Sequence, residues 1–222
     1  MAISFGGKIV KVKRKEQLGI FLLDGSGSMD EVGDHNLSLA ENVNNTFKDF
    51  MTLFQTSSIE HEFQIAVINF DYEATVRVPI TALTDFDVYA DYNPRDRSKD
   101  YPGTNIGLGL LKAQEIIDEY FAQPNPDGYP RSVVIAILSD GMCQHPERTI
   151  SMSDELKHNT DITISCGLFI RKEDMSRAET IETQNFLMQI KSETGAYGKI
   201  LNCEQLRKFF NASMSASKKK DD

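Results

Sequence analysis

The feature that most limits the possible folds is the regular alternation of short apolar runs with longer segments of helical periodicity. Residues 17–23 and 133–138 are almost continuously apolar, the pattern of strands buried on both faces of a parallel sheet. Residues 36–55 instead place Leu39 and Val43 on one face of a helix. Apolar strands that alternate with long helices predict an α/β fold with a doubly wound, mostly parallel sheet and helices on both faces.

Two neighbouring strands lack a helix between them, which predicts one antiparallel edge strand on this sheet. Residues 63–70 and 74–80 both alternate between apolar and polar positions. Pro79 marks the second of these strands as an edge, because proline has no N–H to donate to a neighbour. The other expected elements are helices at 105–121, 146–159, 179–194 and 203–214 and strands at 162–170 and 198–201.

We find no internal repeat and no linker long enough to divide the chain, so we expect one domain over residues 17–214. It follows a basic edge segment, 1–16, and precedes a small, charged tail, 215–222, that we expect to be disordered. The basic residues of the first segment fit a solvated strand better than a binding patch. They are Lys8, Lys11, Lys13, Arg14 and Lys15.

Charge and cysteine content narrow the possible partners and the compartment. Lys and Arg total 24 and Asp and Glu total 33, a formal net charge of -9 that argues against nucleic-acid binding. Cys143, Cys166 and Cys203 form no disulfide framework and have no metal-ligand spacing, which indicates a reducing setting. No apolar run has the length of a signal peptide or a membrane span. We therefore expect a cytoplasmic protein.

Oxygen-bearing side chains follow the ends of the expected strands. Asp24, Ser26 and Ser28 come directly after the first buried strand, and Asp140 follows the strand at 133–138. Thr104 opens a helix after a Pro-Gly turn. Ligands of doubly wound sheets bind outside the carboxyl ends of the strands, so these five side chains are expected to meet there. In Asp-Gly-Ser-Gly-Ser, the glycines are expected to let the backbone turn tightly while alternate side chains face one point.

Five hard oxygen donors favour Mg²⁺ or Mn²⁺, or Ca²⁺, over zinc, which prefers His and Cys. Mg²⁺ uses one or two carboxylates and keeps several waters. An acidic residue of a partner could displace one water and complete the shell, so the metal would bridge the two proteins. The competing interpretation is that the Asp-Gly-Ser run is a polar loop and Asp140 is a helix N-cap.

Three motifs together resemble the metal-ion-dependent adhesion site of von Willebrand factor A domains. They are Asp24-x-Ser26-x-Ser28, Gly103-Thr104-Asn105-Ile106 and Leu138-Ser139-Asp140-Gly141, and the resemblance extends from about residue 17 to 212. It implies a Rossmann-like fold whose metal is held by the two serines and the threonine, with the aspartates acting directly or through water. Ser139 stands where the family often has threonine, a change that we expect not to touch the metal.

The resemblance implies a metal-dependent protein–protein interaction module. Among stand-alone bacterial members, the tellurite-resistance-associated type is the most similar in organisation, which points to stress-response or defence systems. A Mg²⁺-dependent phosphohydrolase with a nucleophilic Asp24 is the alternative function. For this alternative, the sequence offers no second carboxylate near Asp24 and no clear histidine base. It also offers no P-loop, because Gly25-Ser26-Gly27-Ser28 is not followed by Gly-Lys-Ser/Thr. A secreted adhesin would share the site but conflicts with the missing export signal.

Other residues are secondary candidates. The acidic, tyrosine-rich loop 84–103 is expected either to overhang the metal and contact a partner or to be merely solvated. Its acidic and aromatic members are Asp85, Asp87, Asp91, Asp96, Asp100, Tyr89, Tyr92 and Tyr101. His35 fits a surface or helix-start position better than a partner contact, and His145 and Cys143 could border the site. No oligomeric state is predicted.

Overall fold

The computed structural model describes residues 2–5, 8–11, 15–57, 62–96, 98 and 103–216, with the first two stretches as backbone only. Its main feature is a six-stranded sheet with the strand order β5-β4-β3-β6-β7-β8. The strands are β3 (Glu16–Asp24), β4 (Phe63–Phe70), β5 (Ala74–Ala82), β6 (Arg131–Ser139), β7 (Ile162–Phe169) and β8 (Tyr197–Ile200).

All neighbouring strands of this sheet are parallel except β4 and β5, which are antiparallel. The predicted antiparallel edge strand is therefore confirmed, and Pro79 lies on it. In the register, Asp24 of β3 pairs with Phe70 of β4, and Leu23 pairs with Leu138 of β6. The carboxyl ends of the three central strands consequently meet at one edge of the sheet.

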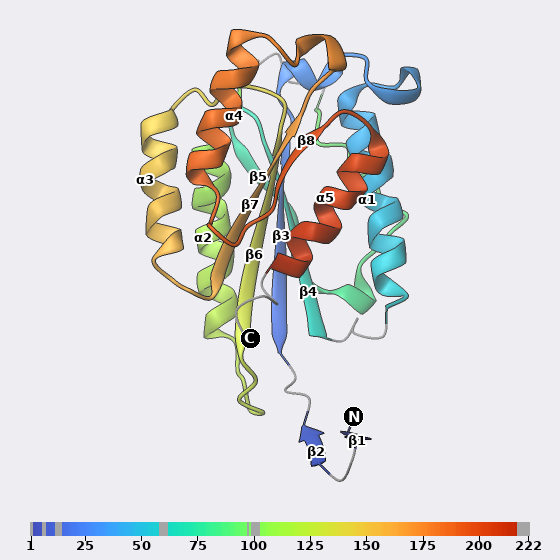
Figure 1. Ribbon diagram of the computed structural model, residues 1–222, viewed down its shortest axis with the longest axis vertical. Coiled ribbons are helices and arrows are strands. Elements are labelled where there is room, and N and C mark those ends of the chain that lie inside the picture. Colours follow the sequence, from blue (N-terminus) through green and yellow to red (C-terminus); the bar gives the residue numbers. More distant parts are fainter. Residues whose placement is uncertain are drawn as a thin grey trace.

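Helices cover both faces of the sheet, as predicted (Figure 1). On one face lie α1 (Leu39–Gln55) and α5 (Cys203–Ser215), which pack against each other. On the other face lie α2 (Ile106–Ala122), α3 (Pro146–Lys157) and α4 (Ala178–Ile190). The fold is thus an α/β, Rossmann-like sandwich.

The sheet separates two hydrophobic cores because successive side chains of a strand point to opposite faces. In β3, Ile20 and Leu22 face the α2–α4 side, whereas Phe21 and Leu23 face the α1–α5 side. Phe21 meets Phe47 of α1 and Phe210 of α5 edge to face, with ring centroids 4.9 and 5.5 Å away. These aromatic contacts fix α1 and α5 against the central strand.

The first helix begins three residues later than its periodicity predicts, at Leu39 instead of residue 36. The reason is a capping box. The Ser38 hydroxyl accepts a hydrogen bond from the Glu41 N–H, and the Glu41 carboxylate accepts one from the Ser38 N–H. Before it, residues 34–36 form a short 3₁₀ turn in which His35 and Asn36 have positive φ angles.

The ends of the chain are only partly described. Strands β1 (Ala2–Phe5) and β2 (Lys8–Lys11) pair with each other as an antiparallel hairpin. Among the described residues, neither of them pairs with a strand of the main sheet. Of the predicted tail, Ser215 belongs to α5 and Ala216 is buried, whereas 217–222 lie outside the described residues. In the part of the chain that the structure describes, no helix combines the length and hydropathy needed to cross a bilayer.

Candidate metal centre

The five predicted donors all lie at the carboxyl edge of the sheet. Asp24 is the last residue of β3 and is fully buried. Ser26 precedes the 3₁₀ turn Gly27–Asp30, and Ser28 lies within it. Thr104 directly precedes Asn105, the N-cap of α2, and Asp140 directly follows β6. The sequence segments that the motifs predicted to converge do converge.

Direct contacts connect four of these residues. The Ser26 N–H donates to Asp24 Oδ1 at 2.8 Å, and the hydroxyls of Ser26 and Ser28 are 3.1 Å apart. The Ser28 hydroxyl donates to Asp140 Oδ1 at 2.9 Å, across 112 positions of the chain. The two aspartates are thus joined through the two serines into one polar cluster.

Thr104 completes the cluster from a third segment. A Cβ atom placed on Gly141 would lie 3.5 Å from Thr104 Oγ1 and 3.9 Å from Ser28 Oγ. The two hydroxyls therefore border the same small space, which stays open because residue 141 has no side chain. Together with the carboxylates of Asp24 and Asp140, to which the serines are hydrogen-bonded, these hydroxyls form the donor set that hard divalent cations bind. The residues present fit a metal ion.

The two carboxyl groups are electrostatically costly without a cation. Burial raises the pKa of Asp24 to about 6, an effect that hydrogen bonds from Ser139 and Ser26 partly offset. Burial, together with the nearby charge of Asp24, raises the pKa of Asp140 to about 8. A divalent cation between these groups would supply the missing positive charge.

Ser139 also belongs to the site, although the sequence motifs do not predict its contact with Asp24. Its hydroxyl donates to Asp24 Oδ2 at 2.5 Å and also lies 3.3 Å from the Gly141 carbonyl. That serine in place of threonine leaves the metal unaffected stays a prediction. The hydroxyl group, which both residues have, holds the Asp24 carboxylate that would bind the ion. The position of Ser139 beside Asp140 in the motif was the available signal.

The glycine at position 25 is needed for a reason other than the one expected. Among the described residues only Gly128 is a glycine with positive φ, so the turn after β3 does not use the left-handed conformation. Instead, a Cβ on Gly25 would lie 2.3 Å from the carbonyl oxygen of Pro94. Glycine is required here because another backbone segment approaches closely.

The competing interpretation of Asp140 as a helix cap does not describe the structure. The N-cap of α3 is His145, followed by Pro146 at the first helical position.

Cys143 is buried, and its Sγ lies 3.3 Å from the Thr149 hydroxyl. His145 is exposed. Within the described ranges, no group of three or more His, Cys, Asp or Glu side chains is arranged to hold a metal.

Part of the loop 84–103 contacts the metal loop, the segment 24–31 that carries Asp24, Ser26 and Ser28. Arg95 forms an ion pair with Asp30 at 2.9 Å, which ties the two loops together. Tyr92 is buried and stacks on Phe86 with ring centroids 5.0 Å apart, so it is a core residue and not an interface residue. Tyr89 is exposed. Asp100 and Tyr101 lie outside the described residues.

His35 is an exposed surface residue whose Nε2 lies 3.7 Å from Asp34 Oδ2.

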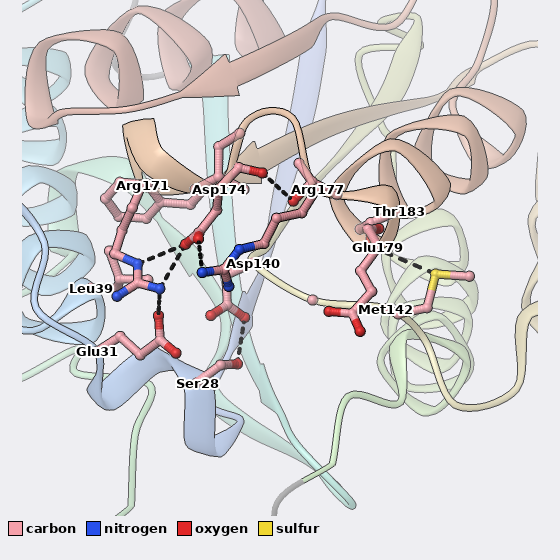
Figure 2. A pocket seen from close by; sticks show the side chains of 14 residues that line it. Ser28, Glu31, Leu39, Asp140, Met142, Arg171, Asp174, Arg177, Glu179 and Thr183 are labelled. Carbon is pink, nitrogen blue, oxygen red and sulfur yellow. Dashed lines mark hydrogen bonds and ion pairs between the residues drawn. The ribbon is translucent and has the colours of Figure 1, made fainter.

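A cavity of about 440 Å³ opens beside the candidate metal centre (Figure 2). Ser28 and Asp140 form one wall, and the segment between β7 and α4 forms the opposite wall. Arg171 and Arg177 extend from that segment into the cavity, where Asp174 lies between their guanidinium groups. The floor is apolar, with Leu39 and buried side chains at the end of β7.

Solved structures share this fold at low sequence identity. Proximal thread matrix protein 1 from the mussel byssus is 15% identical, with 92% of this chain and 49% of that chain covered and a TM-score of 0.64. The pilus adhesin SpaC from Lactobacillus rhamnosus GG, in an open conformation, is 11% identical, with 94% and 30% covered and a TM-score of 0.68. The chain thus spans about half of the mussel protein and under a third of the adhesin.

A second structure of the mussel protein has a zinc-occupied metal-ion-dependent adhesion site. It is 19% identical to this chain, covers 91% of it, is itself covered to 46%, and has a TM-score of 0.57. Such identities show the fold alone. The zinc is an observation on that protein. A search of curated proteins gives no significant match.

The sequence profile of the von Willebrand factor type A domain matches residues 20–211, which is most of the chain. Domains of this family are typically adhesion or protein-interaction modules that bind ligands through a divalent cation and are usually non-catalytic. With the fold and the polar cluster in agreement, the chain belongs to the von Willebrand factor type A domain family.

Proposed function

We propose that this domain binds an acidic residue of a partner protein through a divalent cation held by Asp24, Ser26, Ser28, Thr104 and Asp140. The observation that carries the proposal is the convergence of these side chains from three separate segments on one open space. Two carboxylates balance the charge of the cation, and the neutral hydroxyls leave it electrophilic. An external carboxylate would then complete the coordination shell.

Exposed apolar side chains around the site support a protein as the partner. Each of four loops that follow the carboxyl ends of parallel strands carries one such residue. These residues are Val32 after β3, Tyr72 after β4, Met142 after β6 and Met175 after β7. Apolar and aromatic groups that surround a polar centre are typical of protein interfaces.

Catalysis by the same site is the weaker hypothesis. A phosphohydrolase would use a carboxylate such as Asp24 as a nucleophile. Asp24 is fully buried, and its two carboxylate oxygens accept hydrogen bonds from the Ser26 N–H and the Ser139 hydroxyl. These contacts support a role in holding a cation, not in attacking a substrate.

Mg²⁺ is the proposed cation, with Mn²⁺ and Ca²⁺ as alternatives, because all the donors are oxygens. Zinc is a further candidate, because a protein of the same fold binds it. We also propose a cytoplasmic role in a bacterial stress-response or defence system. The three cysteines are free thiols, which supports a reducing compartment. Fractionation of cells that express the protein at its natural level tests this part.

The test of the binding function is affinity capture from a native lysate with Mg²⁺ or with a chelator. Capture of a partner should require the metal and should be lost in the Asp140→Ala and Thr104→Ala variants. Asp161→Ala and Thr84→Ala are matched controls, because both residues are exposed and lie at the opposite edge of the sheet, where β4 and β7 begin. A partner that is captured equally well in excess chelator would contradict the proposal.

A further inference from the structure

Arg171 connects the candidate metal loop with the segment that follows β7. Its Nη2 lies 3.0 Å from Glu31 Oε2, and its Nε and Nη2 each lie 2.7 Å from Asp174 Oδ2 (Figure 2). Asp174 is the anchor of this arrangement, because it is largely buried and holds the guanidinium group by two donors. Arg171 therefore presents a fixed positive charge to Glu31.

Glu31 follows the three donors of the metal loop closely, directly after Asp30, which pairs with Arg95 on the neighbouring loop. Its N–H donates to the Ser28 carbonyl at 2.9 Å, and its side chain lines the same cavity as Ser28 and Asp140. The charge of Glu31 also contributes to the raised pKa of Asp140, which indicates that the two carboxylates are near each other. The Glu31 side chain is 47% exposed, so its ion pair with Arg171 restrains an otherwise loosely packed group.

We infer that Arg171 is a positioning residue that holds Glu31 away from the metal and thereby keeps one coordination position open for the partner. The inference rests on the proposed function. A glutamate carboxylate is the same kind of ligand as the acidic residue expected from a partner. Because Glu31 belongs to the metal loop, its effective concentration at the ion would be on the order of millimolar or higher. Once released, it would compete with the partner and displace a metal-bound water.

Arg177 offers a matched control in the same cavity. It also contacts Asp174, with Nη2 2.9 Å from Oδ1, but it makes no ion pair with Glu31 among the described residues. Replacing it removes a positive charge of the same kind, at the same wall, without releasing Glu31. Any effect of general electrostatics would therefore appear in both arginine variants.

The experiment uses Mn²⁺ alone as the probe, so it needs no knowledge of the partner. Mn²⁺ affinity is measured by electron paramagnetic resonance, and the number of metal-bound waters is measured by water-proton relaxation. Arg171→Gln should bind Mn²⁺ about tenfold more tightly and carry about one water fewer, because Glu31 becomes a ligand. Arg171→Gln combined with Glu31→Gln should restore both values. Glu31→Gln alone and Arg177→Gln should match the unmodified protein.

The opposite pattern would overturn the inference. If the Arg171–Glu31 pair only braced the loop, each single variant would lower the affinity for Mn²⁺ and the double variant would not restore it. Unchanged affinity and hydration in Arg171→Gln would also exclude the role. Arg171→Lys, which keeps the charge and loses the second donor, gives a milder variant with an intermediate expected shift. Absence of Mn²⁺ binding in the unmodified protein is a separate outcome, which would refute the proposed function.

Discussion

The hydroxyl of Ser139 donates a hydrogen bond to Oδ2 of Asp24 at 2.5 Å, joining the ends of two adjacent strands that are 115 positions apart in the chain. The Ser26 N–H donates to the other oxygen of the same carboxylate. Asp24 is therefore held in one orientation before any metal binds. Such support of a ligand by its neighbours commonly sets metal affinity.

Ser139→Ala should lower the affinity for Mg²⁺ about 10- to 100-fold, because the Asp24 carboxylate loses the donor that orients it. Isothermal titration calorimetry measures the change. Ser139→Thr is the control, since it keeps the hydroxyl and matches the residue that is frequent in the family. Equal affinities of the alanine and threonine variants would show that this hydrogen bond does not organise the site.

Asp140→Asn should make the metal-free protein more stable while removing its Mg²⁺ binding. The substitution removes the half-buried Asp140 carboxyl, which is repelled by the fully buried Asp24, and an amide oxygen can still accept the hydrogen bond from Ser28. We expect a gain of about 1–2 kcal/mol in the free energy of unfolding, reduced by solvent screening. Urea denaturation in chelator measures the gain, and a loss of stability would contradict the electrostatic interpretation.

The metal-free protein should lose stability as the pH rises from about 4 to about 8. The pKa of Asp24 is raised from its ordinary value of 3.8 to about 6 and that of Asp140 to about 8, so the folded state holds these protons more tightly than the unfolded state. Their contribution to stability is present at low pH and is lost as each carboxyl ionises. Urea denaturation at a series of pH values, in chelator, measures the slope.

The Asp140→Asn variant provides the control for this pH dependence. Its free energy of unfolding should change less than that of the unmodified protein between about pH 6 and pH 8, where Asp140 ionises. An identical slope in the two proteins would assign the pH dependence to other groups.

Gly195→Ala should destabilise the fold by about 3 kcal/mol, because its new Cβ would lie 1.9 Å from the Ile164 carbonyl oxygen. Gly198→Ala, on β8, is the matched control, because its Cβ would lie 3.5 Å from the Phe209 ring, an ordinary van der Waals distance. Thermal unfolding of both variants gives the comparison. Similar melting temperatures would show that the chain between α4 and β8 shifts easily.

Much of the fold follows from hydrophobic periodicity. Strand β4 has the predicted bounds, Phe63–Phe70, and β6 differs from its predicted range only by short extensions at the ends. Helix boundaries were less predictable, because they depend on side-chain caps such as the Ser38–Glu41 pair. Periodicity describes the face of a helix and contains no information on such local hydrogen bonds.

The convergence of the candidate ligand residues was predictable, but their supporting contacts were not. Asp24 and Asp140 stand in motifs that can be read directly, whereas the ion pair of Arg171 with Glu31 depends on how two distant loops fold over the sheet edge. The burial of Tyr92 illustrates the same limit, since an acidic loop gives no periodic signal for one inward-facing residue. Contacts between loops arise from tertiary structure and are not encoded in a short window of sequence.

The hydrogen bond between Ser28 and Asp140 has a consequence for the energetics of the whole chain. Because these residues are brought together only when β3 and β6 pair, the unfolded chain has no equivalent binding site. Cation binding should therefore act as a thermodynamic ligand of the native state. At a free metal concentration of 100 times the dissociation constant, it would add about 2.7 kcal/mol to stability. The resistance of this domain to heat and to proteolysis would then report the divalent-ion content of its surroundings.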